Sequence, residues 1–286
     1  MKIASIDIGT NAVKSKIFKT TPTSIEFIEG IRSPIRLGTD VFNNGCLAKE
    51  KLELLVKTLK KYQKNFIKND IAMYEIVATS AFRDTKNSEE ARRYVENKIE
   101  HPIRIISGLE EAKLIRLHPK AQSKSSKVYV DVGGGSTEIY IFENNQHIIQ
   151  SFQLGAVRGM LAKDDPQEWL RLKKWLKKQP KINTLVGLGG NIRSFLNLNN
   201  KKKMNSQNFI DLTLNIKKLD VESKISKYGL QKDRADVIDF ALIIYAEIIK
   251  LLEVKEIKST KWGVSDSIAV KTFHELYSKK ISISRN

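Results

Sequence analysis

The sequence predicts an α/β protein made of two related domains that face each other across a cleft. The order strand, Asp-x-Gly turn, strand, turn, strand occurs near the N-terminus and again after residue 127. Residues 7–18 align without a gap with residues 131–142 and share Asp, Gly, Ile and Phe. Each copy then continues into a Leu-Gly pair, a lysine-rich amphipathic helix and an apolar strand that ends in small residues and an arginine. Two unrelated segments could produce any one of these matches, but the shared order favours a duplication.

The elements of the two copies follow from hydrophobic periodicity and from turn residues. In the first copy we expect strands over residues 2–9, 12–18 and 24–30, a helix over residues 48–66 and a strand over residues 74–78. In the second copy we expect strands starting at residue 128 and over residues 136–142 and 146–152, a helix over residues 165–179 and a strand at the start of residues 183–193.

The boundary between the domains is expected in residues 118–127, which have the polar composition of a linker. The first domain then covers residues 1–120 and the second covers residues 121–286. The C-terminal helix, at about residues 268–286, is a candidate to complete the first domain.

Composition places the chain among globular proteins and excludes several kinds of site. The net charge of +18 favours acidic partners, although solubility alone could also explain it. Cys46 is the only cysteine, which excludes an intrachain disulfide and fits the cytoplasm, and the four histidines lack the spacing of a zinc site. The apolar residues 237–254 include Asp239, Glu247 and Lys250, so we expect a buried helix there and no membrane association.

The two Asp-x-Gly turns are predicted to bind phosphate. Backbone N–H groups can converge on an anion where no Cβ obstructs it. The donors in the first turn are Gly9, Thr10 and Asn11. Those in the second turn are Gly133, Gly134, Gly135, Ser136 and Thr137.

Three carboxylates beside these turns predict a bound Mg²⁺. Asp7, Asp131 and Glu138 would repel phosphate on their own, and a hard divalent cation reverses that effect. The alternative is that the two aspartates only cap their turns. Their equivalent positions in both copies favour the metal.

A second group of polar residues could complete a hydrolytic site. Glu110 and Glu111 begin a helix after a strand, where they could complement the helix dipole or activate a water molecule. Arg83 could bind phosphate oxygens, or it could pair with Asp84 or a glutamate. The residues alone do not choose between these alternatives.

Six motifs occur in the order of a known family. The sequence resembles the exopolyphosphatase and guanosine pentaphosphate phosphohydrolase family in "DIGTNAVK", "ATSAFRDTKN", "ISGLEEAKLI", "DVGGGSTEI", "LGAVRG" and "GLGGNIRSF". That family belongs to the actin, sugar-kinase and Hsp70 superfamily, so the resemblance implies two actin-like domains with a ribonuclease H-like topology. The similarity covers about residues 1–270, and the combined motifs are far more specific than one glycine-rich loop.

The resemblance also implies roles for individual residues. Glu111 would activate the attacking water, Asp131 would hold Mg²⁺, and Arg83 would contact phosphate. The substrate would be inorganic polyphosphate or a guanosine polyphosphate, with a homodimer as a candidate assembly. Two departures make the identity and length of the substrate uncertain. Residues 263–270 read "GVSDSIAV" in place of an Arg-Glu-Gly run, and Phe240 replaces a usual glycine.

Other functions have their own signals. A non-catalytic nucleotide sensor could keep the phosphate loops, but the retained "GLEEA" argues against it. A kinase or ATPase of the superfamily could use the glycines of residues 187–191 for adenosine, but it would place its base elsewhere. Nucleic-acid binding is the weakest alternative, because Trp169, Leu172, Trp175 and Leu176 have the spacing of a buried helix face with lysines opposite.

Overall fold

The computed structural model describes residues 1–123 and 126–283, with side chains as far as Tyr277 in the last helix. Its contacts divide the chain into two compact units. Unit 1 contains Met1–Ser107 together with the segment from Val264 onward, and unit 2 contains Gly108–Gly263. Residues 124 and 125 of the predicted linker lie outside the described residues.

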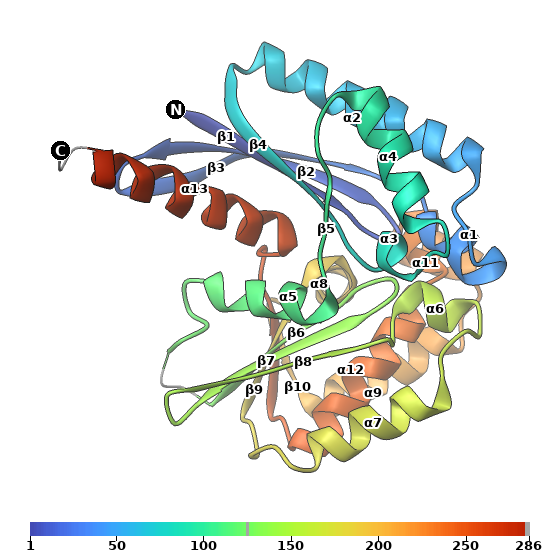
Figure 1. Ribbon diagram of the computed structural model, residues 1–286. Helices are drawn as coiled ribbons and strands as arrows, with labels where there is room; N and C mark the ends of the chain where they lie inside the picture. The colour runs from blue at the N-terminus through green and yellow to red at the C-terminus, as the bar shows by residue number, and fades with distance from the viewer. Residues whose placement is uncertain (124–125, 284–286) are drawn as a thin grey trace. The chain divides into compact units, whose positions relative to one another are not determined.

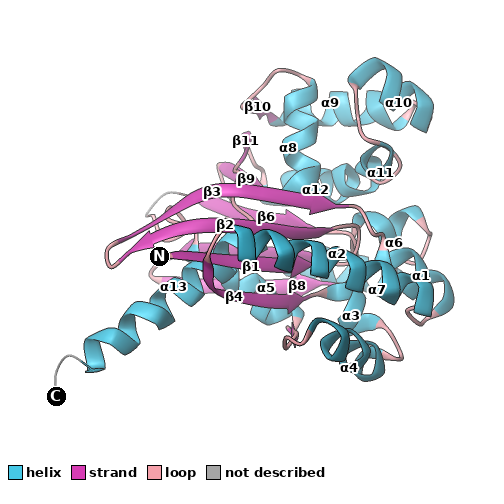
Figure 2. Ribbon diagram, turned by 90° about the horizontal axis from the view of Figure 1, so that it is seen from above, coloured by secondary structure: helices cyan, strands magenta, loops and turns pink. Residues whose placement is uncertain are grey.

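Unit 1 is a five-stranded sheet with helices on both faces (Figure 1). The strands lie in the order β3-β2-β1-β4-β5, and β3, β2, β1 and β4 are seen side by side in Figure 2. Its elements are β1 (Lys2–Ile8), β2 (Val13–Thr21), β3 (Ser24–Ser33), α1 (Leu37–Asn44), α2 (Lys49–Lys68), β4 (Ile71–Ala78), α3 (Ser80–Asp84), α4 (Ser88–Ile99), β5 (Arg104–Ile105) and α13 (Val264–Ile283).

The two faces of this sheet are covered by segments far apart in the sequence. Helix α2 buries a stripe at helical spacing, formed by Leu52, Leu55, Leu59, Tyr62 and Phe66. Helix α13 packs against β1, β2 and β4 on the other side, where Ala269 joins a buried cluster with Ile3 and Phe18. The C-terminal helix therefore belongs to the same unit as the first strand.

Unit 2 is built on a six-stranded sheet in the order β10-β11-β9-β6-β7-β8. Its strands are β6 (Lys127–Val132), β7 (Thr137–Glu143), β8 (Gln146–Phe152), β9 (Thr184–Leu188), β10 (Lys203–Asn205) and β11 (Glu256–Ser259). Its helices are α5 (Gly108–Leu114), the 3₁₀ turn η1 (Ile115–Leu117), α6 (Ala156–Met160), α7 (Pro166–Leu176), α8 (Gly189–Leu198), α9 (Ser206–Lys217), α10 (Val221–Tyr228), α11 (Lys232–Ala235) and α12 (Ile238–Leu252).

The two sheets have the same topology. In each, the first strand pairs antiparallel with the second and parallel with the fourth, and the third strand is at an edge. Strands β6, β7, β8, β9 and β11 thus correspond to β1, β2, β3, β4 and β5, and β10 is an addition at the far edge. The repeated pattern in the sequence reflects a repeated sheet.

Most of the predicted elements are present near the expected positions. Each of the ten elements predicted for the two copies is found, and the apolar residues 237–254 form α12, which is buried against α6, α7, α8 and α9. None of the described helices is long and apolar enough to span a membrane. The predicted domain limits place the boundary after residue 120, whereas the contacts divide the chain after Ser107.

Candidate functional site

The glycine-rich loop of unit 2 is the tight connection between β6 and β7. The N–H of Gly133 donates to the carbonyl oxygen of Ser136 at 2.9 Å, which closes the loop. Thr137 begins β7 and its hydroxyl donates to the Leu154 carbonyl oxygen at 2.7 Å. The loop is therefore fixed at both of its ends.

The carbonyl groups of this loop are held by helix α6. The N–H of Ala156 donates to Gly133 O at 2.9 Å, and the N–H of Val157 donates to Gly134 O at 2.7 Å. The Nε of Arg158 donates to Gly135 O at 3.1 Å. No described residue accepts a hydrogen bond from the N–H of Gly134. A loop whose carbonyls are held on one side can offer such an N–H group to an anion.

The loop of unit 1 is built in the same way. Gly9 N–H donates to Ala12 O at 3.2 Å, as Gly133 does to Ser136. The N–H groups of Arg36 and Gly38, at the start of α1, donate to the carbonyls of Asn11 and Thr10 at 3.0 and 2.9 Å. In both units, therefore, a helix that follows the third strand holds the carbonyls of the loop.

The Leu-Gly pair of each copy explains how the helix comes so close. An ideal Cβ on Gly38 would lie 2.1 Å from Thr10 Cγ2, and one on Gly155 would lie 2.6 Å from the carbonyl carbon of Gly134. Only glycine allows this approach. The sequence shows the repeated pair, but its contact with the loop is seen only in the structure.

The residues opposite the two aspartates differ between the units. Asp7 lies opposite Lys14 in the β1–β2 ladder, and Lys14 Nζ is 3.0 Å from Asp7 Oδ2. Asp131 lies opposite Glu138 in the β6–β7 ladder, and Ser151 donates to Glu138 at 3.0 Å. Side chains directly opposite each other in a ladder are neighbours on one face. Unit 1 thus has an ion pair where unit 2 has two carboxylates.

These two carboxylates fit a magnesium ion better than Asp7 does. Neighbouring carboxylates repel each other, and a divalent cation relieves that repulsion. Among the described residues, no group of three or more His, Cys, Asp or Glu side chains could hold a metal. Mg²⁺ commonly uses one or two carboxylates and takes its other ligands from water and phosphate, so a pair such as Asp131 and Glu138 matches the number of carboxylates that it uses. Asp7 fits less well because Lys14 already neutralises it.

The two glutamates of α5 differ in their exposure to solvent. Glu111 is buried, with 9% of its surface exposed, and Glu110 is exposed. Helix α5 packs against β7 and β8, and β7 starts directly after the glycine loop. Unit 2 thus contains Glu111, the loop, Asp131 and Glu138. The burial of Glu111 favours it over Glu110 as a residue with a specific task.

Arg83 lies near the base of the other loop. It is on α3, which follows β4, and Thr79 at the end of β4 donates its N–H to Ile8 O at 3.1 Å, one residue before Gly9. Its Nη1 donates to Ile106 O at 2.8 Å, and its Nε is 3.9 Å from Asp84. Unit 1 therefore contains Asp7, the residue 9–11 loop and Arg83.

The glycines between β9 and α8 have contacts within unit 2. An ideal Cβ added to Gly187 would lie 2.6 Å from Ile192. One added to Gly189 would lie 2.6 Å from Asp131 Oδ1, and one added to Gly190 would lie 2.5 Å from Arg234 Nη2. Gly189 also has a φ of 78°. This turn thus packs beside the Asp131 carboxylate, so its glycines are explained without a bound adenosine.

Tyr245 supports the strand ends beneath Asp131. Its hydroxyl is 3.2 Å from Val130 O, within β6, and 3.3 Å from Leu188 O, at the end of β9. Burial, and then the Asp131 charge, raise the pKa of Tyr245 well above its usual value, so the hydroxyl stays protonated.

We expect Tyr245→Phe to lower the free energy of unfolding by about 1–2 kcal/mol, because it removes the donor to two buried carbonyl groups. Urea denaturation at neutral pH measures this change. Tyr228→Phe, in the partly exposed end of α10, is the matched control and should change stability by less. Equal stabilities of the Tyr245 variant and the wild type would contradict the proposed support.

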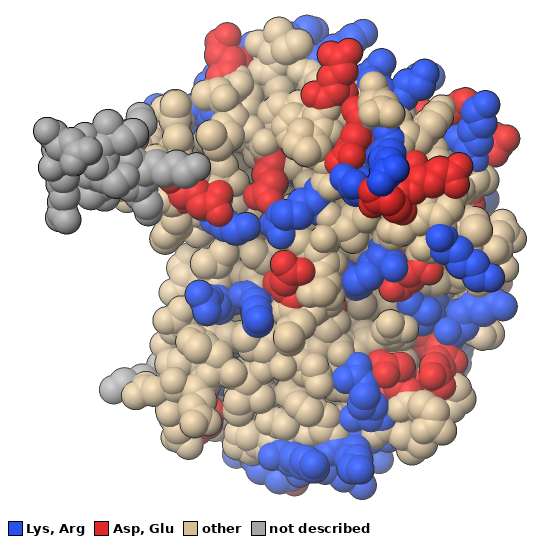
Figure 3. All heavy atoms as spheres, viewed as in Figure 1, with Lys and Arg blue, Asp and Glu red and all other residues tan. Residues whose placement is uncertain are grey.

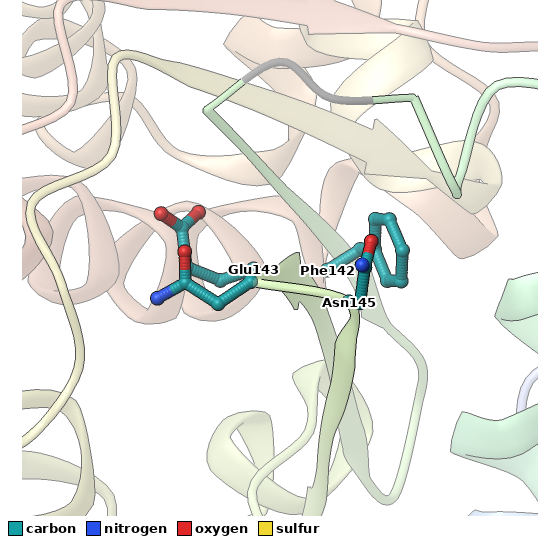
Figure 4. Close-up of a pocket in the computed structure, with 4 residues that line it drawn as sticks. Phe142, Glu143 and Asn145 are labelled. Carbon is teal, nitrogen blue, oxygen red and sulfur yellow. The ribbon is translucent and has the colours of Figure 1, made fainter.

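Other surface features do not belong to this site. A pocket of about 360 Å³ at the β7–β8 turn is lined by Phe142, Glu143, Asn144 and Asn145 (Figure 4). It lies at the opposite end of β7 from the glycine loop, about 20 Å away if each strand residue advances by its usual rise.

Figure 3 shows Lys and Arg side chains spread over the visible face of each unit, with acidic side chains between them. On α7, Leu172 and Leu176 of the predicted helix face are buried, whereas Trp169 and Trp175 are only half-buried.

The comparisons with known proteins agree with this geometry. The model of the Ppx/GppA phosphatase family matches residues 16–276. The chain belongs to the Ppx/GppA phosphatase family. The family name classes it with hydrolases, as predicted.

The chain is similar to curated proteins and to several solved structures. A bifunctional 3-dehydroquinate synthase/phosphatase of Fusobacterium nucleatum is 29% identical over 285 residues, covering 86% of this chain and 43% of that protein. The chain thus spans less than half the length of this relative. The Ppx/GppA family member of Aquifex aeolicus has a TM-score of 0.77 at 24% identity, and an exopolyphosphatase of Cytophaga hutchinsonii has 0.85 at 18%. Both matches cover 96% of this chain and 98% of the other, and they confirm the predicted fold of two α/β units.

The two departures from the Ppx/GppA pattern have structural contexts. Phe240 packs on α6, because an ideal Cβ on Gly159 would lie 3.1 Å from its ring. In residues 263–270, Asp266 is paired with Lys16 of β2 at 2.5 Å, and Ser5 donates to the Ser265 carbonyl oxygen at 2.7 Å. Phe240, Ser265 and Asp266 thus each contact residues of the unit to which they belong.

Proposed function

We propose that this chain hydrolyses the terminal phosphoanhydride bond of inorganic polyphosphate, with guanosine pentaphosphate as a second candidate substrate. The observation that supports this most directly lies in unit 2. A glycine loop with its carbonyls held by α6 stands beside two opposed carboxylates and leads into β7, a strand against which the helix of the buried Glu111 packs. Membership of the Ppx/GppA family supports the same reaction class.

In the proposed reaction, Glu111 accepts a proton from a water molecule that attacks the terminal phosphorus. A new P–O bond forms from that water, the bridging P–O bond breaks, and orthophosphate leaves a chain shorter by one phosphate. The N–H of Gly134, for which no described residue is an acceptor, stabilises the charge on the transferred group. A bound Mg²⁺ would supply further charge stabilisation for phosphate oxygens, held by Asp131 and Glu138.

The loop of unit 1 is also proposed to bind phosphate. Gly9, Thr10 and Asn11 form the same closed turn as the glycine loop, and Arg83 lies one helical turn beyond Thr79 at its base. A guanidinium presents a planar set of donors that matches phosphate oxygens.

The substrate is tested by phosphate release from four compounds at equal concentration of phosphoanhydride bonds. Purified protein and Mg²⁺ should be incubated separately with long-chain polyphosphate, tripolyphosphate, guanosine pentaphosphate and ATP. We expect the highest kcat/KM with a polyphosphate or with guanosine pentaphosphate. Preferential hydrolysis of ATP would favour the ATPase alternative, and binding of guanosine pentaphosphate without phosphate release would favour a sensor.

The metal is tested by removal and by substitution. We expect a chelator to reduce phosphate release at least tenfold and added Mg²⁺ to restore it. The loss of one group that supports a metal site commonly lowers metal affinity or activity by roughly tenfold or more. Asp131→Asn should raise the Mg²⁺ concentration at half-maximal activity, whereas Asp211→Asn, at an exposed position of α9, should not. Mg²⁺ should also raise the thermal unfolding midpoint of the wild type more than that of Asp131→Asn. Identical Mg²⁺ responses of wild type and Asp131→Asn would remove Asp131 from the metal site.

A further inference from the structure

The turn between β9 and α8 carries a buried polar side chain that the proposed reaction does not use. Asn191 lies in the first turn of α8, and only 4% of its surface is exposed. Its Nδ2 donates to the carbonyl oxygen of Val132 at 2.8 Å. Val132 is the last residue of β6, directly before Gly133. The side chain therefore reaches the strand end at which the glycine loop begins.

The amide group of Asn191 is held in one orientation by two different partners. Nη1 of Arg234, in α11, donates to Asn191 Oδ1. A guanidinium only donates and a backbone carbonyl only accepts, so the amide must direct its oxygen to Arg234 and its nitrogen to Val132. Gly190 allows the guanidinium to come this close, because an ideal Cβ there would lie 2.5 Å from Arg234 Nη2.

The bond to Val132 fixes the first peptide group of the glycine loop. The carbonyl of Val132 and the N–H of Gly133 belong to the same planar peptide. Asn191 holds its oxygen, and Ser136 O accepts its N–H at 2.9 Å. The next peptide carries the N–H of Gly134, for which no described residue is an acceptor. A tilt of the first peptide would therefore displace that N–H group.

In unit 1, the equivalent carbonyl is held by the backbone of the neighbouring strand. Ile8, the equivalent of Val132, accepts the N–H of Thr79 at 3.1 Å, one residue past the end of β4. In unit 2, the neighbouring strand β9 ends at Leu188, which pairs with the residue before Val132. The side chain of Asn191 thus takes the place of a backbone donor.

We propose that Asn191 is a positioning residue, which fixes the first peptide group of the phosphate-binding glycine loop through Val132. This inference depends on the proposed function, because it assigns the loop to substrate phosphate. Asn191 acts through this peptide and makes no contact with the substrate. Its substitution should displace the N–H of Gly134 rather than remove it, so the loss of activity should be smaller than that for a missing oxyanion donor.

Asn191→Asp is the first test, because aspartate has the same shape and still accepts from Arg234 but cannot donate to Val132. Asn197→Asp, at an exposed position of the same helix, is the matched control. With tripolyphosphate and Mg²⁺, we expect Asn191→Asp to lower kcat by about tenfold, which is less than the roughly 100-fold loss for a missing donor. Asn197→Asp should keep the wild-type kcat.

Amide hydrogen exchange without substrate gives a readout that does not depend on activity. The N–H of Gly133 donates to Ser136 O, so its exchange reports whether the first peptide is held. We expect this exchange to be about tenfold faster in Asn191→Asp and unchanged in Asn197→Asp. Residues 172–176 of α7 should exchange at the wild-type rate in both variants, which separates a local effect from a general loss of stability. Asn191→Ala, which lacks both polar atoms, provides a second variant with the same direction of change.

The two readouts separate the possible failures. Unchanged exchange at Gly133 in both Asn191 variants would overturn the inference, even if kcat falls. Exchange that is equally faster in α7 would also overturn it, because the side chain would then only stabilise unit 2. Faster exchange at Gly133 alone with an unchanged kcat would overturn it too, since the held peptide would then not affect the reaction. A wild type that releases no phosphate from any of the four compounds would refute the proposed function, and exchange alone would then decide whether Asn191 holds the loop.

Discussion

Replacing Glu111 with glutamine is expected to reduce kcat for phosphate release from polyphosphate by a factor of roughly 100 to 10,000, the usual contribution of a general base. Glutamine has nearly the same shape as glutamate but cannot accept the proton of the attacking water. Because Glu111 is buried on a helix that packs against β7 and β8, the neutral side chain should leave the fold intact. The measurement is kcat at saturating polyphosphate, accompanied by thermal unfolding to verify folding.

Glu110→Gln is the control for this experiment, because the two glutamates are adjacent and only Glu111 is buried. We expect Glu110→Gln to keep kcat within about twofold of the wild type, as is usual for an exposed surface substitution. A full loss of activity in Glu110→Gln with an active Glu111→Gln would exchange the proposed roles of the two residues. Activity in both variants would require a different base.

The strands and the duplication could be predicted because their signals are local. Alternation of apolar and polar residues identifies β2, a run of apolar residues identifies β7, and the Asp-x-Gly turns mark the ends of β1 and β6. These features depend on residues a few positions apart. They are therefore visible in a single sequence, and the sheet order that they imply is found in both units.

The difference between the two aspartates could also have been predicted from register. Once residues 7–18 are aligned with residues 131–142, Lys14 and Glu138 occupy equivalent positions opposite Asp7 and Asp131. A four-residue loop closed by Gly9 and Ala12 sets this pairing. The sequence thus contained the evidence that Asp7 has a cationic partner and Asp131 an acidic one.

The contacts of the C-terminal segment could not be predicted in this way. Asp266 pairs with Lys16, 250 residues earlier, and Ser265 accepts a hydrogen bond from Ser5. No local pattern identifies such partners, because they depend on α13 returning to the first sheet. The residues of "GVSDSIAV" therefore looked like a departure from the family pattern, whereas in the structure they connect α13 to β1 and β2.

Gly155→Ala is expected to have the second large effect, through the position of the loop rather than through a chemical group. The added Cβ would lie 2.6 Å from the carbonyl carbon and oxygen of Gly134 and 2.6 Å from the carbonyl carbon of Gly135. These are backbone atoms, so the loop or the start of α6 must move. A displacement of about 1 Å at a reacting group can reduce the rate about 100-fold, and we expect a loss of that order in kcat/KM for polyphosphate. Overpacking should also lower the free energy of unfolding by about 1–3 kcal/mol.

The control for this steric argument is Gly229→Asn, at a left-handed helix end where an ideal Cβ meets no atom within 4 Å. Asparagine tolerates that conformation, so both kcat/KM and stability should remain close to the wild type. Steady-state kinetics and urea denaturation of the two glycine variants give the comparison. Because the Cβ added at Gly155 would push directly on the Gly134 carbonyl, a fully active and folded Gly155→Ala protein would mean that the glycine loop does not set the position of the substrate. The loop would then lose its place in the proposed reaction, whatever the result for Glu111.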